Sequence, residues 1–261
     1  MKLTIVRTDK KKVQHLTVKS VEWFLERIKT DTKAEDIGKM REYIARFGDN
    51  GHYEQNTPIA MIYPSVEMAK AENGNLEIVG FNNLICLHIS GLMTQNDIKA
   101  VKEASKILPT TFAAFIGSDG KSVEVLVSVA QKDTESKPQT EQEMDAFCAA
   151  AYEVAFGAYG GLLPKPIERQ SAKARSFFRM TLDPEPYYNP QVTPMMIQRG
   201  LGGESNARNF SKEDEISEIC EVNLKSSFQK NLGIPINFQE ESGLITFEAL
   251  NSTSLSRCQQ I

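Results

Sequence analysis

The sequence has 261 residues, 41% hydrophobic and 25% charged, which is ordinary for a soluble globular protein of one large domain, with or without a small appendage. The net charge of −4 excludes an overall basic character, so any contact with nucleic acid has to come from a local patch. The four cysteines lie far apart without a Cys-x-x-Cys pair, no apolar run approaches the length of a membrane span, and the N-terminus lacks the apolar stretch of a signal peptide. We therefore expect a cytoplasmic protein with free thiols and no membrane contact.

The spacing of apolar residues predicts both strands and helices in the first half of the chain. The expected strands cover residues 2–8, 59–63 and 84–89. The expected helices cover residues 21–28 and 36–47. Ser20 is a suitable N-cap for the first helix, and Gly48 is a suitable end for the second. The stretch that contains Asn73-Gly74-Asn75 is interpreted as a polar segment.

Two capping boxes, Thr94–Asp97 and Thr140–Glu143, predict helix starts further along the chain. We expect the first of these helices to end near residue 108 and the second at Gly160-Gly161. The expected strands cover residues 112–116, 123–129 and 177–182. The first two of these strands flank a glycine-bearing turn and are predicted to form a hairpin.

The mixture of helices, strands and hairpins predicts an α+β fold with a partly antiparallel central sheet flanked by helices. A first domain is expected over residues 1–190, followed by a flexible loop or linker over 191–210. A capping box at Ser211 and a glycine turn near Gly243 predict a C-terminal helix plus β-hairpin over 211–261. That segment is either an appendage or part of the same core.

The strand over residues 84–89 carries an unusual pair of polar side chains. His88 and Ser90 are two residues apart, so on a continuing strand they project from the same face. The rest of the strand, Leu84-Ile-Cys-Leu, is apolar and typical of a buried position in a sheet. This face of the strand is therefore a candidate functional site.

Three segments of the chain together resemble a known family. They are residues 84–92, residues 112–127, and residues 175–190, the last of which ends in Asp183-Pro-Glu-Pro-Tyr-Tyr-Asn-Pro190. Their order and spacing are similar to the N-terminal domain of virulence-associated E proteins, which are mobile-element proteins similar to primase-polymerases of the archaeo-eukaryotic primase superfamily. The resemblance covers about residues 1–190 and implies a primase-polymerase-like fold.

The resemblance also implies where a catalytic site would lie. Such primases hold metal ions with two carboxylates on one strand and a third from a neighbouring strand, and a basic side chain meets the triphosphate. In this sequence the first two positions are His88 and Ser90, the third is Asp183, and the basic position is Glu124. The resemblance therefore implies a degenerate site that is not an active primase.

Two readings of these residues remain open. His88, Glu124 and Asp183 could converge as a rebuilt metal site, because histidine with two carboxylates suits manganese, iron or zinc. Alternatively, His88 is a half-buried histidine that hydrogen-bonds Ser90 or an acid in the remains of an old cleft. No cofactor is expected unless the site is active, in which case Mg or Mn would be required.

A local basic cluster could supply contacts to nucleic acid, since its residues are interleaved with Phe177 and Phe178. The alternative is an ordinary solvated surface. Lys121, on the predicted hairpin turn, adds a further positive charge near the candidate site. The cluster consists of Lys165, Arg169, Lys173, Arg175 and Arg179.

We therefore expect a catalytically degenerate, primase-like domain that binds nucleic acid or nucleotide. The alternatives are an active metal-dependent nucleotidyltransferase or nuclease with a rebuilt site, and a non-catalytic interaction scaffold. The sequence contains no Gly-x-x-x-x-Gly-Lys-[Ser/Thr] phosphate loop. If DNA replication by this protein needs a helicase, we expect that helicase on another chain.

Overall fold

The computed structural model describes residues 1–9, 11–30, 36–48, 59–132 and 138–197, all of which lie within one compact unit. The predicted C-terminal helix and hairpin, and the part of the predicted linker beyond residue 197, lie outside the described residues. No helix in the described ranges is long and apolar enough to cross a membrane.

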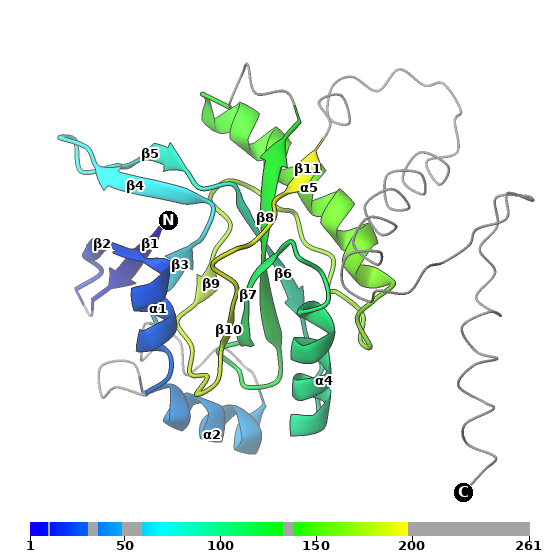
Figure 1. The fold of residues 1–261 in the computed structure, drawn as a ribbon. Helices are drawn as coiled ribbons and strands as arrows, with labels where there is room; N and C mark the ends of the chain where they lie inside the picture. Colours follow the sequence, from blue (N-terminus) through cyan, green and yellow to red (C-terminus); the bar gives the residue numbers. More distant parts are fainter. Residues whose placement is uncertain (10, 31–35, 49–58, 133–137, 198–261) are drawn as a thin grey trace, which may run out of the picture. The chain divides into compact units, whose positions relative to one another are not determined.

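Figure 1 shows the helices and strands of this unit. In the described part of the chain the helices are α1 (Val21–Arg27), α2 (Ile37–Phe47), α4 (Gln95–Ser105) and α5 (Glu141–Gly160). The strands there are β1 (Lys2–Thr8), β2 (Gln14–Ser20), β3 (Met61–Tyr63), β4 (Val66–Lys70), β5 (Leu76–Phe81), β6 (Leu84–Ile89), β7 (Thr111–Ile116), β8 (Val123–Gln131), β9 (Phe178–Arg179), β10 (Tyr187–Tyr188) and β11 (Met195–Ile197).

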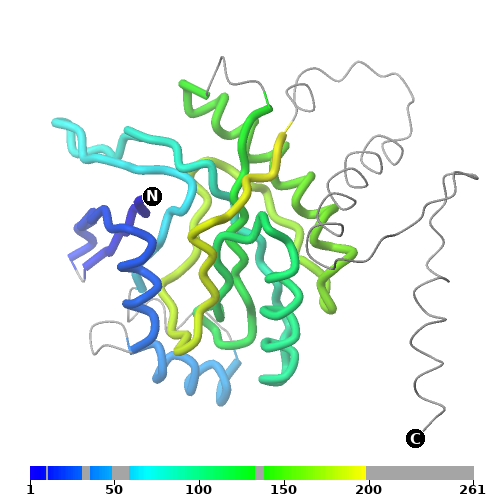
Figure 2. Tube along the Cα trace, in the orientation of Figure 1, coloured from blue at the N-terminus to red at the C-terminus, as the bar shows by residue number. Residues whose placement is uncertain are grey.

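The central sheet is built around β8, which pairs antiparallel with both β6 and β7. β10 pairs antiparallel with β7, and β11 pairs parallel with the last residues of β8. Figure 2 shows this last segment, residues 187–197, as the yellow end of the described trace beside the green strands. The predicted α+β class and the partly antiparallel central sheet are thus confirmed.

A second sheet has the strand order β2-β1-β3-β9, and all of its pairs are antiparallel. β4 and β5 form a separate two-stranded hairpin. These two strands lie where the sequence predicts only a polar segment, so neither strand was predicted. Its Asn73-Gly74 turn is nevertheless a common hairpin signal, with Gly74 at φ +83° and Asn73 Oδ1 accepting the Asn75 N–H.

The two faces of the central sheet contact different partners because side chains alternate along each strand. On one face, Ile85, Leu87 and Ile89 of β6 join the four buried valines at 123, 125, 127 and 129 against α4 and α5. On the other face, Leu84 and Leu126 pack with α1, α2 and the second sheet. Cys86, His88 and Glu124 share this second face.

The three helix starts predicted from capping residues are confirmed where the structure describes them. Ser20 Oγ accepts the Trp23 N–H at the start of α1. Thr94 with Asp97 and Thr140 with Glu143 form complete capping boxes at α4 and α5. Each cap satisfies backbone N–H groups that the first helical turn leaves without a partner.

Candidate functional site

A cavity of about 400 Å³ lies beside β6, between that strand, α5, residues 170–179 and the turn that joins β7 to β8. Its volume falls within the roughly 300–1,000 Å³ typical of small-molecule sites. His88 and Glu124 contribute to its lining from the central sheet, and Lys173 and Arg179 contribute from the opposite segment. The cavity therefore brings together acidic, basic and aromatic side chains.

His88 and Glu124 form a cross-strand pair inside this cavity. They are directly opposite in the β6–β8 register, and His88 Nδ1 lies 2.8 Å from Glu124 Oε1. The other carboxylate oxygen, Glu124 Oε2, accepts the Cys86 thiol at 3.2 Å. The second ring nitrogen, His88 Nε2, lies 3.6 Å from Glu168 Oε2. The imidazole is thus held between two carboxylates.

The surroundings of the cavity change the pKa values of His88 and Cys86. Burial alone lowers the pKa of His88, but the hydrogen bond and charge of Glu124, with the charges of Glu168 and Asp119, outweigh it and raise the pKa. Burial raises the pKa of Cys86 well above its usual range, and the neighbouring Glu124 charge raises it further. These shifts favour the neutral Cys86 thiol and the protonated His88 imidazole beside the Glu124 carboxylate.

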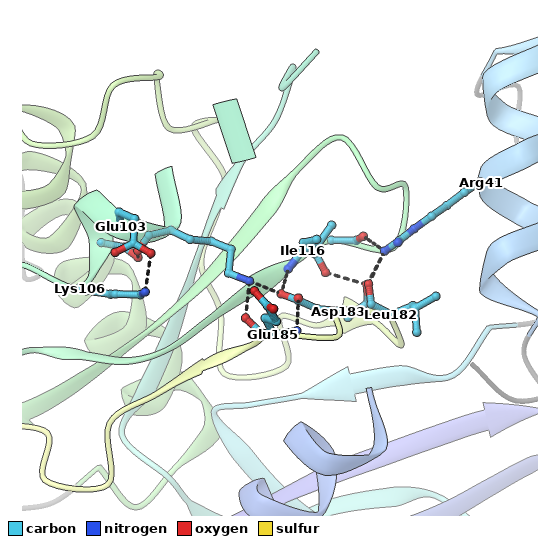
Figure 3. Close-up of polar contacts among 11 residues, drawn as sticks. Arg41, Glu103, Lys106, Ile116, Leu182, Asp183 and Glu185 are labelled. Carbon is cyan, nitrogen blue, oxygen red and sulfur yellow. Dashed lines mark hydrogen bonds and ion pairs between the residues drawn. The ribbon is translucent and has the colours of Figure 1, made fainter. Parts of the chain in front are cut away.

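Asp183, the third residue of the predicted constellation, has different partners (Figure 3). Its side chain is 2% exposed and lies 2.7 Å from Lys102 Nζ of α4. The same carboxylate accepts the Ile116 N–H at the end of β7 and the Glu185 N–H, each at 2.9 Å. Asp183 does not line the cavity. The structure therefore brings His88 and Glu124 together and places Asp183 in a buried ion pair.

The close-up in Figure 3 also shows how α2 secures this region. Arg41 donates to the carbonyl oxygens of Gly117 and Leu182, each at 2.8 Å, and so joins the β7–β8 turn to the segment that leads into Asp183. Within the described residues, no group of three or more His, Cys, Asp and Glu side chains is arranged to hold a metal ion. Ser90, which follows the end of β6, does not line the cavity.

The predicted basic cluster divides into two groups. Lys165 pairs with Asp97, and Arg169 pairs with Glu153, both at 3.0 Å. Arg175 pairs with Glu141 through two nitrogens and also donates to the Leu76 carbonyl. Only Lys173 and Arg179 of the cluster line the cavity, while Lys121 is exposed on the β7–β8 turn.

The family model of the BT4734-like, N-terminal domain matches residues 54–188. This chain belongs to that family. The chain matches no curated protein and no solved structure. Every residue that lines the cavity falls within the matched span, so the cavity is built wholly by the BT4734-like N-terminal domain.

Sequence reasoning missed several residues of the BT4734-like domain that shape the cavity. Tyr152 of α5 donates to the Glu168 carbonyl and accepts the Gln170 N–H, which fixes the cavity wall next to His88. Asp119 accepts hydrogen bonds from the Ser122 hydroxyl and the Lys121 N–H, which shapes the turn at the cavity end. The Gly117–Gly120 turn was a visible signal for Asp119, whereas nothing in the sequence of α5 distinguishes Tyr152 from an ordinary core residue.

Proposed function

We propose that this chain is a catalytically degenerate, primase-like domain that binds a nucleotide or single-stranded nucleic acid in the β6 cavity. The observation that carries this proposal is the meeting of two cationic side chains, Lys173 and Arg179, with the His88–Glu124 pair in one cavity. Cations beside a cavity attract phosphate groups. Phe177, which is 48% exposed and also lines the cavity, offers a face on which a base can stack.

The chemistry of the side chains supports binding rather than nucleotidyl transfer. Metal-dependent transfer uses carboxylates that present free oxygens to divalent ions. Of the two carboxylates in the rebuilt metal site considered above, Glu124 is engaged by His88 and Cys86, and Asp183 is engaged by Lys102. A cation would have to displace these partners before it could bind.

The resemblance to virulence-associated E proteins supports the primase-like part of the proposal. It also suggests a mobile-element setting, in which a helicase on another chain would supply any motor activity. The family assignment is compatible with the resemblance to virulence-associated E proteins. The matched span, residues 54–188, includes two of the three resembling segments completely and most of the third.

Fluorescence anisotropy with a labelled single-stranded oligonucleotide at several salt concentrations tests the proposal. We expect binding that weakens as salt rises, and a weaker affinity for Lys173→Ala. Lys165→Ala is the matched control, since Lys165 pairs with Asp97 and does not line the cavity. An absence of binding to oligonucleotides and nucleotides at low salt would refute the proposal, and template-directed extension with manganese would refute its degenerate part.

A further inference from the structure

The peptide groups of β6 alternate between the partner strand and the open edge of the sheet. Within the described residues, β6 pairs with β8 alone. At the Leu84–Ser128 position, the Ser128 N–H donates away from β6, to the Thr110 carbonyl, and the Leu84 carbonyl accepts the Ser65 hydroxyl at 2.6 Å. Two positions beyond Cys86, the His88 carbonyl accepts the Glu168 N–H at 2.8 Å. Leu84 and His88 therefore both direct their peptide groups to the open edge.

Cys86 lies midway between these two residues. Because peptide direction repeats every two residues, its N–H and C=O also point to the open edge. Cys86 lines the cavity, and no described residue hydrogen-bonds to either of its peptide groups. One backbone donor and one backbone acceptor thus face the cavity side by side, and polar groups in such a position require a partner.

The open part of the edge has a defined length. At one end the Ser65 hydroxyl donates a hydrogen bond to the Leu84 carbonyl. At the other end the Glu168 N–H donates to the His88 carbonyl. A peptide that extends a sheet needs several consecutive free positions, which this edge does not offer. A single planar group that carries a neighbouring donor and acceptor fits the opening.

We propose that the Cys86 peptide is the base-binding position of the cavity. Its C=O would accept an amino N–H of a nucleobase, and its N–H would donate to the adjacent ring nitrogen, as the edge of adenine permits. This inference rests on the proposed function, because Lys173 and Arg179 of the same cavity are assigned to the phosphate. It adds that the protein recognises the base through its backbone.

Titration with adenosine 5′-monophosphate and with ribose 5-phosphate, which lacks the base, tests this assignment. Labelling cysteine with ¹⁵N gives four possible amide signals, and the signal of Cys86 is the one that disappears in Cys86→Ala. We expect the adenosine nucleotide to shift that signal and to bind at least about tenfold more tightly than ribose 5-phosphate, a difference of about 1.4 kcal/mol. Purine riboside 5′-monophosphate, which lacks the amino group, should bind with an affinity between those of the other two compounds.

Two variants separate the backbone from the thiol. Cys86→Ala keeps both peptide groups and should bind the adenosine nucleotide as the parent protein does. Cys86→Pro lacks the thiol as Cys86→Ala does, and in addition it replaces the outward N–H by the proline ring, which an edge strand tolerates at such a position. If folded Cys86→Pro keeps the full affinity, or if the Cys86 amide signal of the parent protein does not move, the base-binding assignment is wrong.

The possible failures are distinguishable. Equal affinity for the adenosine nucleotide and ribose 5-phosphate would overturn the base-binding position and leave phosphate binding in the cavity intact. If neither compound binds and no oligonucleotide binds at low salt, the proposed function itself fails, together with this inference.

Discussion

His88 Nδ1 lies 2.8 Å from Glu124 Oε1, and this contact joins two strands at directly opposite positions in the register. The carboxylate favours the protonated imidazole, so the pKa of His88 is raised above the value of about 6.5 in an unfolded chain. A raised folded-state pKa contributes stability that is fully present below the unfolded-state value and is lost as pH rises through the folded-state value.

We therefore expect the loss of unfolding free energy caused by His88→Gln to be largest at pH 5.5. This loss should become smaller as pH rises through the folded-state pKa towards 8.5. Glutamine can still donate a neutral hydrogen bond to Glu124, so the comparison isolates the charge. Urea unfolding at a series of pH values measures this difference. In a Glu124→Gln background the same substitution should show a much weaker pH dependence. A difference that stays constant with pH in the parent background would contradict the prediction.

Lys102→Met should be strongly destabilising. The substitution leaves the Asp183 carboxylate buried without its cation, and breaking such a pair typically costs about 3–5 kcal/mol. Lys106→Met is the matched control on the C-cap of the same helix, because Lys106 forms an exposed pair with Glu103 that contributes at most about 1 kcal/mol. Denaturant unfolding measures the free energy of unfolding of both variants. Similar losses for the two would show that the Lys102–Asp183 pair stabilises the protein no more than an exposed pair does.

Arg175→Ala should reduce stability and Lys173→Ala should reduce oligonucleotide affinity, although the two residues lie in the same basic segment. Arg175 joins Glu141 of α5 to the Leu76 carbonyl of β5, so its loss should cost about 1 kcal/mol of stability and leave oligonucleotide affinity unchanged.

The Lys173 side chain is exposed and lines the cavity, so its loss should leave the free energy of unfolding within about 0.5 kcal/mol of the parent value. It should also reduce the slope of log affinity against log salt by about 0.7 for a single strand. Thermal unfolding and anisotropy on both variants measure the two effects. Weaker binding by Arg175→Ala and not by Lys173→Ala would contradict this assignment.

Gly120→Ala should destabilise the β7–β8 turn. Gly120 has φ +73°, and an added Cβ would lie 2.9 Å from Cδ of Arg41, which itself holds the turn. The left-handed conformation alone costs an L-residue about 1–2 kcal/mol. Gly161→Ala is the control, because its φ is −79° and a Cβ there meets nothing within 4 Å. Equal melting temperatures for the two variants would show that the turn tolerates a side chain.

The sequence was sufficient for elements with a long or well-marked pattern. β6, the β7–β8 hairpin and the capped helices α4 and α5 were predicted because alternation and capping residues act locally. The family resemblance suggested that His88 and Glu124 lie near each other, but the sequence left open whether His88 meets Glu124 and Asp183 together or instead bonds Ser90 or another acid. The strands β9, β10 and β11 have only two or three residues each, and such short strands form because a longer neighbour offers its edge.

Partners from distant parts of the chain could not be predicted in the same way. Lys102 of α4 meets Asp183 across 81 positions, and its place in the helix pattern gives no indication of a buried ion pair. The pairing of Arg175 with Glu141 likewise depends on how α5 packs beside the β4–β5 hairpin. The outward direction of the Cys86 peptide depends on strand register, which side-chain patterns do not reveal.

β11 has a consequence for the length of chain that folds as a unit. Met195 and Ile197 are buried in the same core as α5, and β11 covers the last residues of β8. A fragment that stopped at residue 190 would remove these side chains and uncover a hydrophobic strand edge, which is a template for self-association. The stretch that completes this core and covers the end of β8 therefore extends beyond the span that identifies the family, which ends at residue 188.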